Sequence, residues 1–122
     1  MTEKYLLWNR VIDEICSRDL SELSAVQRKA VLCFWYDAEI NSGGHSGYFD
    51  NYPDTDPQEL YGALAEIGGT VCAENFMKAL SASERKSGYI DTDNAFYELS
   101  PSLAELLENY VYRNIDIFSD MN

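Results

Sequence analysis

The stretch that decides the fold covers residues 24–44, SAVQRKAVLCFWYDAEINSGG. Ser24 and Gln27 have the spacing of a capping box, in which two side chains bond each other's backbone amides at the start of a helix. The uninterrupted apolar run of 30–36 follows. The glycines within 41–44 have the conformational freedom that a helix end requires. We therefore predict a central helix, apolar on nearly every side and buried in the core.

The apolar run of 30–36 is also compatible with a buried strand. A helix is favoured because the capping box precedes the run, because only Val31 in it is β-branched, and because the flanking residues are compatible with a helix. No stretch of the chain shows the strict alternation of apolar and polar residues that is typical of strands. The sequence therefore predicts an all-α protein.

Apolar residues at helical spacing predict further helices on both sides of the central one. A first helix is expected from about Thr2 to Ser17, and a short helical turn is expected around Tyr48 and Phe49. A third helix should begin with Asp56 as N-cap, Pro57 at the first helical position and Glu59 completing a capping box, and should end at Gly68-Gly69. Its predicted buried face is Leu60, Ala63, Leu64 and Ile67.

The remaining third of the chain gives weaker helix signals. We expect a helix over 70–80 that buries Val71 and Leu80, a mobile polar loop over 81–88, and a short helix over 94–99. Ser100-Pro101 is expected to cap one long final helix, with Ile115 on its apolar face. The result is an irregular bundle of about six or seven helices that forms a single domain over residues 1–122.

The charge of the chain is strongly negative and unevenly distributed. Nine Lys and Arg face 21 Asp and Glu, which gives a formal net charge of −12. Residues 30–77 contain eight acids and no Lys or Arg at all. Such a field repels nucleic acid and anionic lipid and attracts basic proteins. Nucleic acids and membrane surfaces are therefore excluded as expected partners.

The cysteines, one acidic segment and the lengths of the apolar segments limit the redox state, the bound ligands and the location that we expect. The three cysteines, Cys16, Cys33 and Cys72, are odd in number and lie in apolar stretches, which predicts reduced core residues. Asp54-Thr55-Asp56 lacks the glycine and the final glutamate of a calcium loop, so neither a metal nor a cofactor is predicted. No segment resembles a secretory leader or a membrane span, which predicts a cytoplasmic protein.

One fifteen-residue stretch, DAEINSGGHSGYFDN at 37–51, has the character of a signature. It resembles a bacterial family of small helical proteins usually called the DNA-mimic protein family. The resemblance covers about residues 20–118 and departs at His45, where a large apolar residue is expected, and at Gly47, where glutamine is expected. The matching positions are Glu39, Asn41, Gly43, Gly44, Tyr48, Phe49 and Asn51, followed by Ala65-Glu66-Ile67-Gly68 and the Tyr110-Val111 helix.

The resemblance implies an all-helical, often dimeric domain. Its acidic surface would imitate the phosphate charge of DNA and occupy the DNA-binding face of a transcription factor. The motif residues Glu39, Asn41, Gly43, Gly44, Phe49 and Asn51 are interpreted as mainly structural. In particular, Glu39 and Asn41 are expected to bond the backbone of the loop that follows them.

A mimic needs carboxylates in a row on a rigid support, because duplex DNA carries about one charge per 1.7 Å of its axis. Asp50, Asp54, Asp56 and Glu59 lie in and just after the aromatic turn. Glu66 comes seven residues after Glu59 and returns to the same helix face, which extends the row by about 10 Å. We predict that these five acids bind the partner, with Tyr48 and Tyr52 as aromatic anchors.

His45 is the single histidine of the chain. With Glu39 or Asp50 it could form an acid–base pair, but no serine or cysteine nucleophile motif accompanies it, so a turn or surface position is predicted. The leading hypothesis is therefore a non-enzymatic, DNA-mimicking or otherwise acidic binding protein that sequesters a basic partner protein. The alternatives are an immunity-type inhibitor of a cationic toxin and a small hydrolase or ligand-binding enzyme that uses His45.

Overall fold

The computed structural model describes residues 3–119, and over this range the protein is all-α. It contains eight α-helices, one 3-10 turn and no strand in the described chain, which confirms the predicted fold class. The predicted helix start at Thr2 lies outside the described residues. The elements are α1 (Glu3–Ile15), η1 (Leu20–Glu22), α2 (Ala25–Asn51), α3 (Pro57–Gly68), α4 (Thr70–Ala79), α5 (Ala82–Ser87), α6 (Ile90–Tyr97), α7 (Leu103–Arg113) and α8 (Ile115–Ser119).

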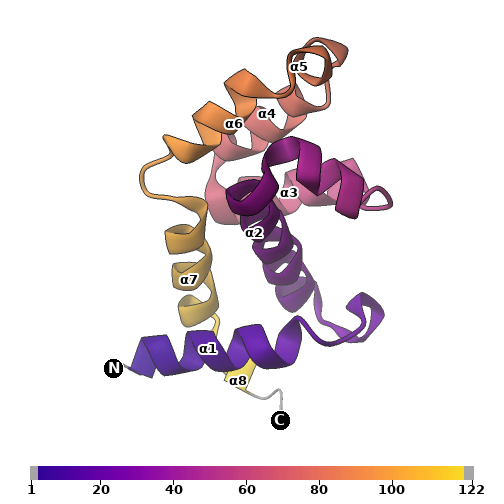
Figure 1. Ribbon diagram of the computed structural model, residues 1–122. Helices are drawn as coiled ribbons and strands as arrows, with labels where there is room; N and C mark the ends of the chain where they lie inside the picture. Colours follow the sequence, from indigo (N-terminus) through magenta and orange to yellow (C-terminus); the bar gives the residue numbers. More distant parts are fainter. Residues whose placement is uncertain (1–2, 120–122) are drawn as a thin grey trace.

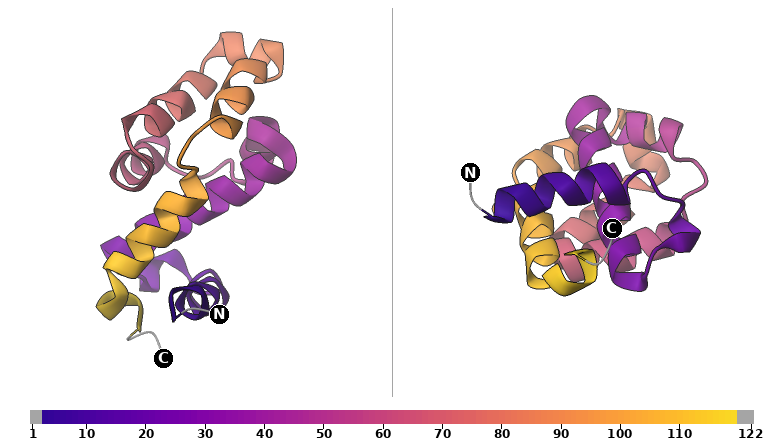
Figure 2. Two further views of the ribbon diagram at one scale, coloured as in Figure 1. Left: turned by 90° about the vertical axis from the view of Figure 1, so that its left-hand side faces the viewer. Right: turned by 90° about the horizontal axis from the view of Figure 1, so that it is seen from below.

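Helix α2 is the axis around which the others are arranged (Figure 1). Helices α3 and α7 both pack on α2 and on each other, α4 packs on α3, and α6 packs on α4 and α2. Helix α1 crosses below them against α7, and the two ends of the chain lie at the same lower end of an elongated molecule (Figure 2). The core is the space enclosed by α2, α3, α4 and α7.

The central helix begins as predicted but does not stop where it was expected to stop. Ser24 and Gln27 form the predicted capping box. Gly44 breaks the helix with φ 67° and ψ −172°, a conformation that is essentially restricted to glycine. The chain then resumes a helix at once and continues to Asn51, in place of the predicted short turn. The glycine signal therefore marks a kink within α2.

Helix α3 confirms its predicted N-cap and its predicted buried face. Asp56 accepts a hydrogen bond from the Gln58 amide, and Pro57 occupies the first turn. Leu60, Ala63, Leu64 and Ile67 are all buried. Glu59 does not complete a capping box, because its carboxylate is turned toward Arg28 on α2.

Three predictions for the segment 70–99 need correction. Val71 is 72% exposed, and Cys72 and Ala73 are buried in its place. The predicted mobile loop at 81–88 is largely the short helix α5, whose amide of Glu84 bonds to the Ser81 hydroxyl. Helix α6 occupies 90–97, so it begins four residues and ends two residues earlier than predicted.

The final helix differs from its prediction at both ends. Its cap is Ser102, which forms a capping box with Glu105, and not Ser100. It ends at Arg113, and Asn114 separates it from α8. Ile115 is consequently 40% exposed and does not continue an apolar face.

The cysteines are free thiols, as predicted, with Cys33 and Cys72 buried. Burial raises the pKa of Cys16 to about 11 and that of Cys72 to about 12, so these thiols stay protonated at neutral pH. Within residues 3–119, no group of three potential ligands is placed to hold a metal ion. In the same part of the chain, no helix is long and apolar enough to cross a membrane.

Candidate functional site

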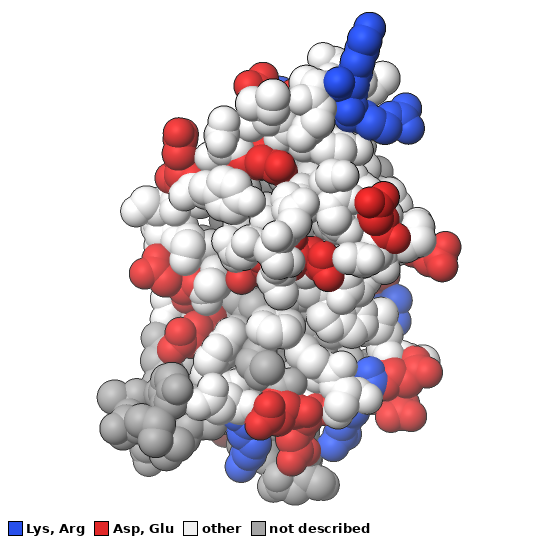
Figure 3. Space-filling model, in the orientation of Figure 1, with Lys and Arg blue, Asp and Glu red and all other residues white. Residues whose placement is uncertain are grey.

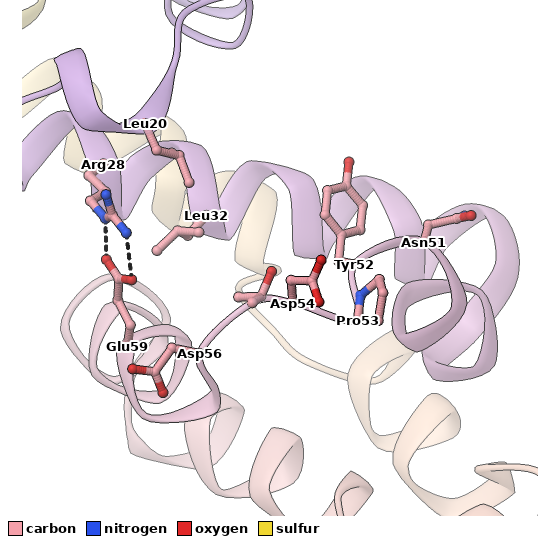
Figure 4. A pocket seen from close by; sticks show the side chains of 10 residues that line it. Leu20, Arg28, Leu32, Asn51, Tyr52, Pro53, Asp54, Asp56 and Glu59 are labelled. Atoms are coloured by element: carbon pink, nitrogen blue, oxygen red, sulfur yellow. Dashed lines mark hydrogen bonds and ion pairs between the residues drawn. The ribbon is translucent and has the colours of Figure 1, made fainter.

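Three neighbouring cavities surround the second half of α2 and the connection to α3. We call the first the carboxylate cavity; it has a volume of about 370 Å³ (Figure 4). It is bordered by η1, by α2, by the connection and by the first turn of α3. Its lining residues are Leu20, Arg28, Leu32, Asn51, Tyr52, Pro53, Asp54, Thr55, Asp56 and Glu59.

The second, the aromatic cavity, adjoins the first and has a volume of about 270 Å³. It is lined by Tyr48, Phe49, Tyr52, Pro53, Thr55, Pro57, Phe76 and Leu80. The third, of about 320 Å³, lies between α2, α4 and α5 and is lined by Phe49, Asp50, Ala79, Leu80, Arg85 and Tyr89. Neighbouring cavities share lining residues: Tyr52, Pro53 and Thr55 between the first two, and Phe49 and Leu80 between the last two.

Six of the seven predicted partner-binding residues line these cavities. Tyr52, Asp54, Asp56 and Glu59 border the first, Tyr48 and Tyr52 the second, and Asp50 the third. Glu66 lies apart from them on the last turn of α3. The structure thus brings these six residues to neighbouring cavities, which the sequence did not indicate, and their role in partner binding stays a prediction.

The acidic side chains of this surface differ in whether their carboxylates already have a hydrogen-bond or ion-pair partner. Asp50 and Asp54 are exposed, and among the described residues neither carboxylate takes part in a hydrogen bond or an ion pair. One oxygen of Asp56 accepts the Gln58 amide at 2.9 Å, which leaves the other oxygen available. These three carboxylates are the ones that can receive a cation without displacing a partner.

Glu59 and Glu66 are already partnered by bases from the beginning of α2. Both oxygens of Glu59 accept from the Arg28 guanidinium, with Nη2 at 2.9 Å from Oε1 (Figure 4). Glu66 pairs with the Lys29 ammonium at 3.3 Å and accepts from the Tyr110 hydroxyl at 2.9 Å. The Tyr110 hydroxyl, followed by Lys29, lowers the pKa of Glu66. The row of five acids therefore does not stand free along its whole length.

The two predicted aromatic anchors have different positions. Tyr48 is 3% exposed and belongs to the core, although it also lines the aromatic cavity. Tyr52 is partly exposed and stacks on Trp35, with ring centroids 5.5 Å apart, and on Tyr48, with centroids 5.3 Å apart. This double stacking fixes the Tyr52 ring on the wall between the first two cavities.

One hydrogen bond between two motif residues joins the two halves of α2. Glu39 accepts a hydrogen bond of 3.0 Å from the Asn51 side chain, which links the first half of α2 to its last residue. Asn41 donates to the preceding carbonyl of Asp37 at 2.8 Å. The predicted bonds from Glu39 and Asn41 to the backbone of the following loop are thus wrong. Phe49 lines the aromatic cavity, Gly43 continues the helix and Gly44 forms the kink.

His45 is fully buried, which overturns the predicted turn or surface position. Its Nδ1 lies 2.6 Å from Oδ1 of Asp93 on α6, and the same carboxylate oxygen accepts the His45 backbone amide at 2.9 Å. Its Nε2 lies 2.6 Å from the Tyr36 hydroxyl. A neutral ring that donates from Nδ1 and accepts at Nε2 satisfies both neighbours. Burial lowers the pKa of His45, against the opposing effect of Asp93, which favours this neutral form.

This buried network is unsuited to act on a ligand. A general base must come within hydrogen-bond reach of its substrate, directly or through one water. The His45 ring is 0% exposed and lies on the wall of none of the three cavities. The hydrolase hypothesis required a pocket that joins His45 to a carboxylate, and these cavities do not supply it.

Charge on the face seen in Figure 3 is spread out rather than gathered into one plane. Acidic side chains are separated by uncharged surface, and basic side chains lie mainly over α5 and toward the lower end. A continuous acidic strip on this face is therefore not observed. The grouping of free carboxylates around the α2–α3 connection is therefore a more specific indication of a binding surface than the total charge.

Sequence reasoning missed several residues of this region. Arg28 lies 31 positions before Glu59, and nothing local in the sequence indicates that it reaches α3. Asp93 and His45 are 48 positions apart, so their contact has no local signal. Leu80 was predicted to be buried, but it is 40% exposed at the edge of two cavities.

The comparisons with known proteins are specific at the level of the family. A family model described as DMP19-like protein matches residues 21–114. No curated protein and no solved structure shows significant similarity to the chain. The match covers all helices from α2 to α7, including the kink and every residue that lines the three cavities except Leu20. The chain therefore belongs to the DMP19-like family, a family of DNA-mimic proteins.

Proposed function

We propose that this protein is a non-enzymatic acidic binding protein that occupies the basic surface of a DNA-binding protein, such as a transcription factor. The observation that carries the proposal is the set of free carboxylates of Asp50, Asp54 and Asp56 beside one connected stretch of cavities. Family membership and the net charge of −12 support it. A cationic surface that binds phosphates also binds carboxylates held in place by a rigid scaffold.

The arrangement favours rigid presentation of these carboxylates. Helices α2 and α3 flank the connection that carries Asp54 and Asp56, and the Arg28–Glu59 pair joins the two helices next to it. Pro53 and Pro57 restrict the backbone on either side of the two aspartates. Because the acids are held before the partner arrives, little ordering entropy is lost on binding.

Competition with DNA tests this proposal most directly. The tagged protein is used to capture partners from a lysate at low salt, and each captured protein is purified and bound to a fluorescent DNA duplex. We expect the acidic protein to displace the duplex. The affinity of the captured partner for the acidic protein, like its affinity for DNA, should fall steeply between 50 and 300 mM salt, because both contacts are electrostatic. A partner that binds DNA and the acidic protein simultaneously would contradict mimicry.

The same experiment separates the main alternative. Capture of a cationic toxin whose activity is blocked would support an immunity-type inhibitor in place of a transcription-factor ligand. The dimeric state and the cytoplasmic location stay predictions. Sedimentation of the purified chain would test the first, and fractionation of the producing cells the second.

A further inference from the structure

The carboxylate cavity and the aromatic cavity meet at a common wall made by Tyr52, Pro53 and Thr55. A single short segment of a bound chain can therefore place neighbouring side chains in both. The chemistry of the two cavities differs, and this difference indicates which side chains they fit.

The carboxylate cavity combines free acids with apolar walls. Three carboxylates and one guanidinium border it, and the guanidinium of Arg28 is already held by Glu59. Asp54 and the second oxygen of Asp56 remain as acceptors. Leu20 and Leu32 offer apolar contact of the kind that the methylene groups of a long cationic side chain make. Such a cavity repels phosphates and carboxylates and accepts a cation with an apolar stem.

The carboxylates of this cavity favour arginine over lysine. A guanidinium is planar and bonds two carboxylate oxygens at once, whereas an ammonium is a compact, strongly hydrated point charge. The Tyr52 ring is held by its stacking on Trp35 and Tyr48, so it forms a fixed wall. The Arg28–Glu59 pair shows the same two-pronged contact within the protein itself.

The aromatic cavity has no charged residue on its wall. Aromatic rings and prolines make up most of its lining, and Leu80 is a large apolar side chain that is 40% exposed at its rim. Covering this surface with another apolar side chain would remove it from water, which is favourable in proportion to the area covered. Charge imitation alone gives no reason for such a surface next to free acids.

We propose that these two cavities form one docking site for a segment of a basic partner protein in which an arginine stands beside a large apolar side chain. The inference rests on the proposed function and adds a specificity that charge imitation does not provide. The arginine enters between Asp54, Asp56 and Tyr52. The apolar neighbour covers Leu80 and the adjoining rings.

The probe is the pentapeptide acetyl-Gly-Phe-Arg-Phe-Gly-amide, which offers an apolar side chain on either side of the arginine. The full-length protein is titrated with it while backbone amide shifts are followed by NMR. Three further probes separate the contributions: a peptide with lysine in place of arginine, a peptide with glycine in place of both phenylalanines, and spermidine, which carries charge alone. We expect shifts at Tyr52, Asp54, Thr55 and Leu80, and binding of each comparison probe weaker by about threefold or more.

Matched variants test the two halves of the site. Asp54→Asn with Asp56→Asn removes two charges and keeps an N-cap at 56, because asparagine caps helices as well as aspartate does. We expect about fivefold weaker binding or more. Glu74→Gln with Glu98→Gln removes two exposed charges elsewhere and should leave binding close to that of the unchanged protein. Leu80→Ala should weaken binding of the phenylalanine peptide, whereas Ile90→Ala, at another exposed apolar position, should not.

Equal binding of the arginine peptide, the lysine peptide and spermidine would overturn the docking site, as would shifts spread over all acidic surfaces. The absence of peptide shifts at saturating concentration would also overturn it. These failures differ from failure of the proposed function. If the proposed function fails, a captured partner does not compete with DNA. If only the docking site fails, the partner still competes with DNA, and both pairs of charge variants weaken its binding equally.

Discussion

Gly43 and Gly44 are neighbours in the sequence but have opposite structural requirements. Gly43 is exposed and helical, and a Cβ built on it meets no atom within 4 Å. Gly44 has φ 67°, and a Cβ there would clash with Oδ2 of Asp93, the carboxylate that holds His45. Only the second glycine is required by the backbone and by its neighbours.

We therefore predict opposite effects of alanine at these two positions. Gly44→Ala should lower the free energy of unfolding by roughly 2–4 kcal/mol, because it strains the backbone and displaces Asp93 from His45. Gly43→Ala should raise it by about 0.5–1 kcal/mol, because alanine is favoured within a helix. Urea unfolding of both variants measures the two effects. Equal effects at the two positions would contradict the kink at Gly44.

The buried histidine predicts a specific dependence of stability on pH. Burial lowers the pKa of His45 in the folded protein, while the unfolded chain titrates near 6.5. Below about pH 6.5 the unfolded state takes up the proton first, so the free energy of unfolding falls as the pH decreases. The pKa values of Glu66 and Glu84 are also lowered, but the stability that these two carboxylates contribute is lost only below about pH 4.5.

His45→Asn isolates this effect, because the asparagine amide can still donate to Asp93 while the side chain no longer titrates. The chain has no other histidine. We expect a shallower decline in unfolding free energy between pH 7 and 5.5 in the variant than in the unchanged protein. Urea unfolding at several pH values checks this. Parallel declines would show that His45 is not the group responsible.

At the scale of elements, helix starts were predictable where the capping signal is local. Ser24 with Gln27 and Asp56 with Pro57 are motifs of four residues or fewer, and both caps are present as predicted. The start of α7 was misplaced by two residues, because two serines flank Pro101 and each could serve as the cap. The choice between them depends on Glu105, which bonds back to the amide of Ser102.

This choice gives a prediction with an internal control. Ser102→Ala should lower the free energy of unfolding by about 1 kcal/mol, because it removes the bond to the Glu105 amide. Ser100→Ala should change it by less than about 0.5 kcal/mol, because Ser100 is exposed outside the helix. Thermal unfolding of the two variants side by side measures the difference. A larger loss at Ser100 would place the cap where the sequence alone had put it.

The candidate site shows why local patterns predict only part of a functional surface. Asp50, Asp54, Asp56 and Glu59 lie within ten residues, so the sequence alone groups them. The pairing of Glu59 with Arg28 and of Glu66 with Lys29 joins residues 31 and 37 positions apart. Such pairs depend on how α2 and α3 pack. Counting the charges of a segment does not reveal these two ion pairs, although Arg28 and Lys29 stand immediately before the stretch without Lys or Arg.

At the scale of the whole molecule, two electrostatic effects oppose each other. The net charge of −12 makes the folded chain repel itself, and salt screens this repulsion over about a Debye length, roughly 8 Å at physiological ionic strength. Salt also weakens attractive pairs such as Arg28–Glu59 and Lys29–Glu66. Each of these pairs is partly exposed and contributes at most about 1 kcal/mol, of which screening removes only a fraction.

We therefore expect repulsion to dominate, so that the midpoint of thermal unfolding rises by roughly 2–5 °C between 20 and 300 mM sodium chloride. Over the same range the complex with a basic partner should weaken, because salt screens the attraction between them. The two trends have opposite signs, so loss of binding at high salt cannot result from unfolding of this protein. A midpoint that falls with salt would mean that the internal ion pairs outweigh the repulsion from the net charge. The carboxylates of the protein would then be less available to a partner than the free Asp50 and Asp54 indicate.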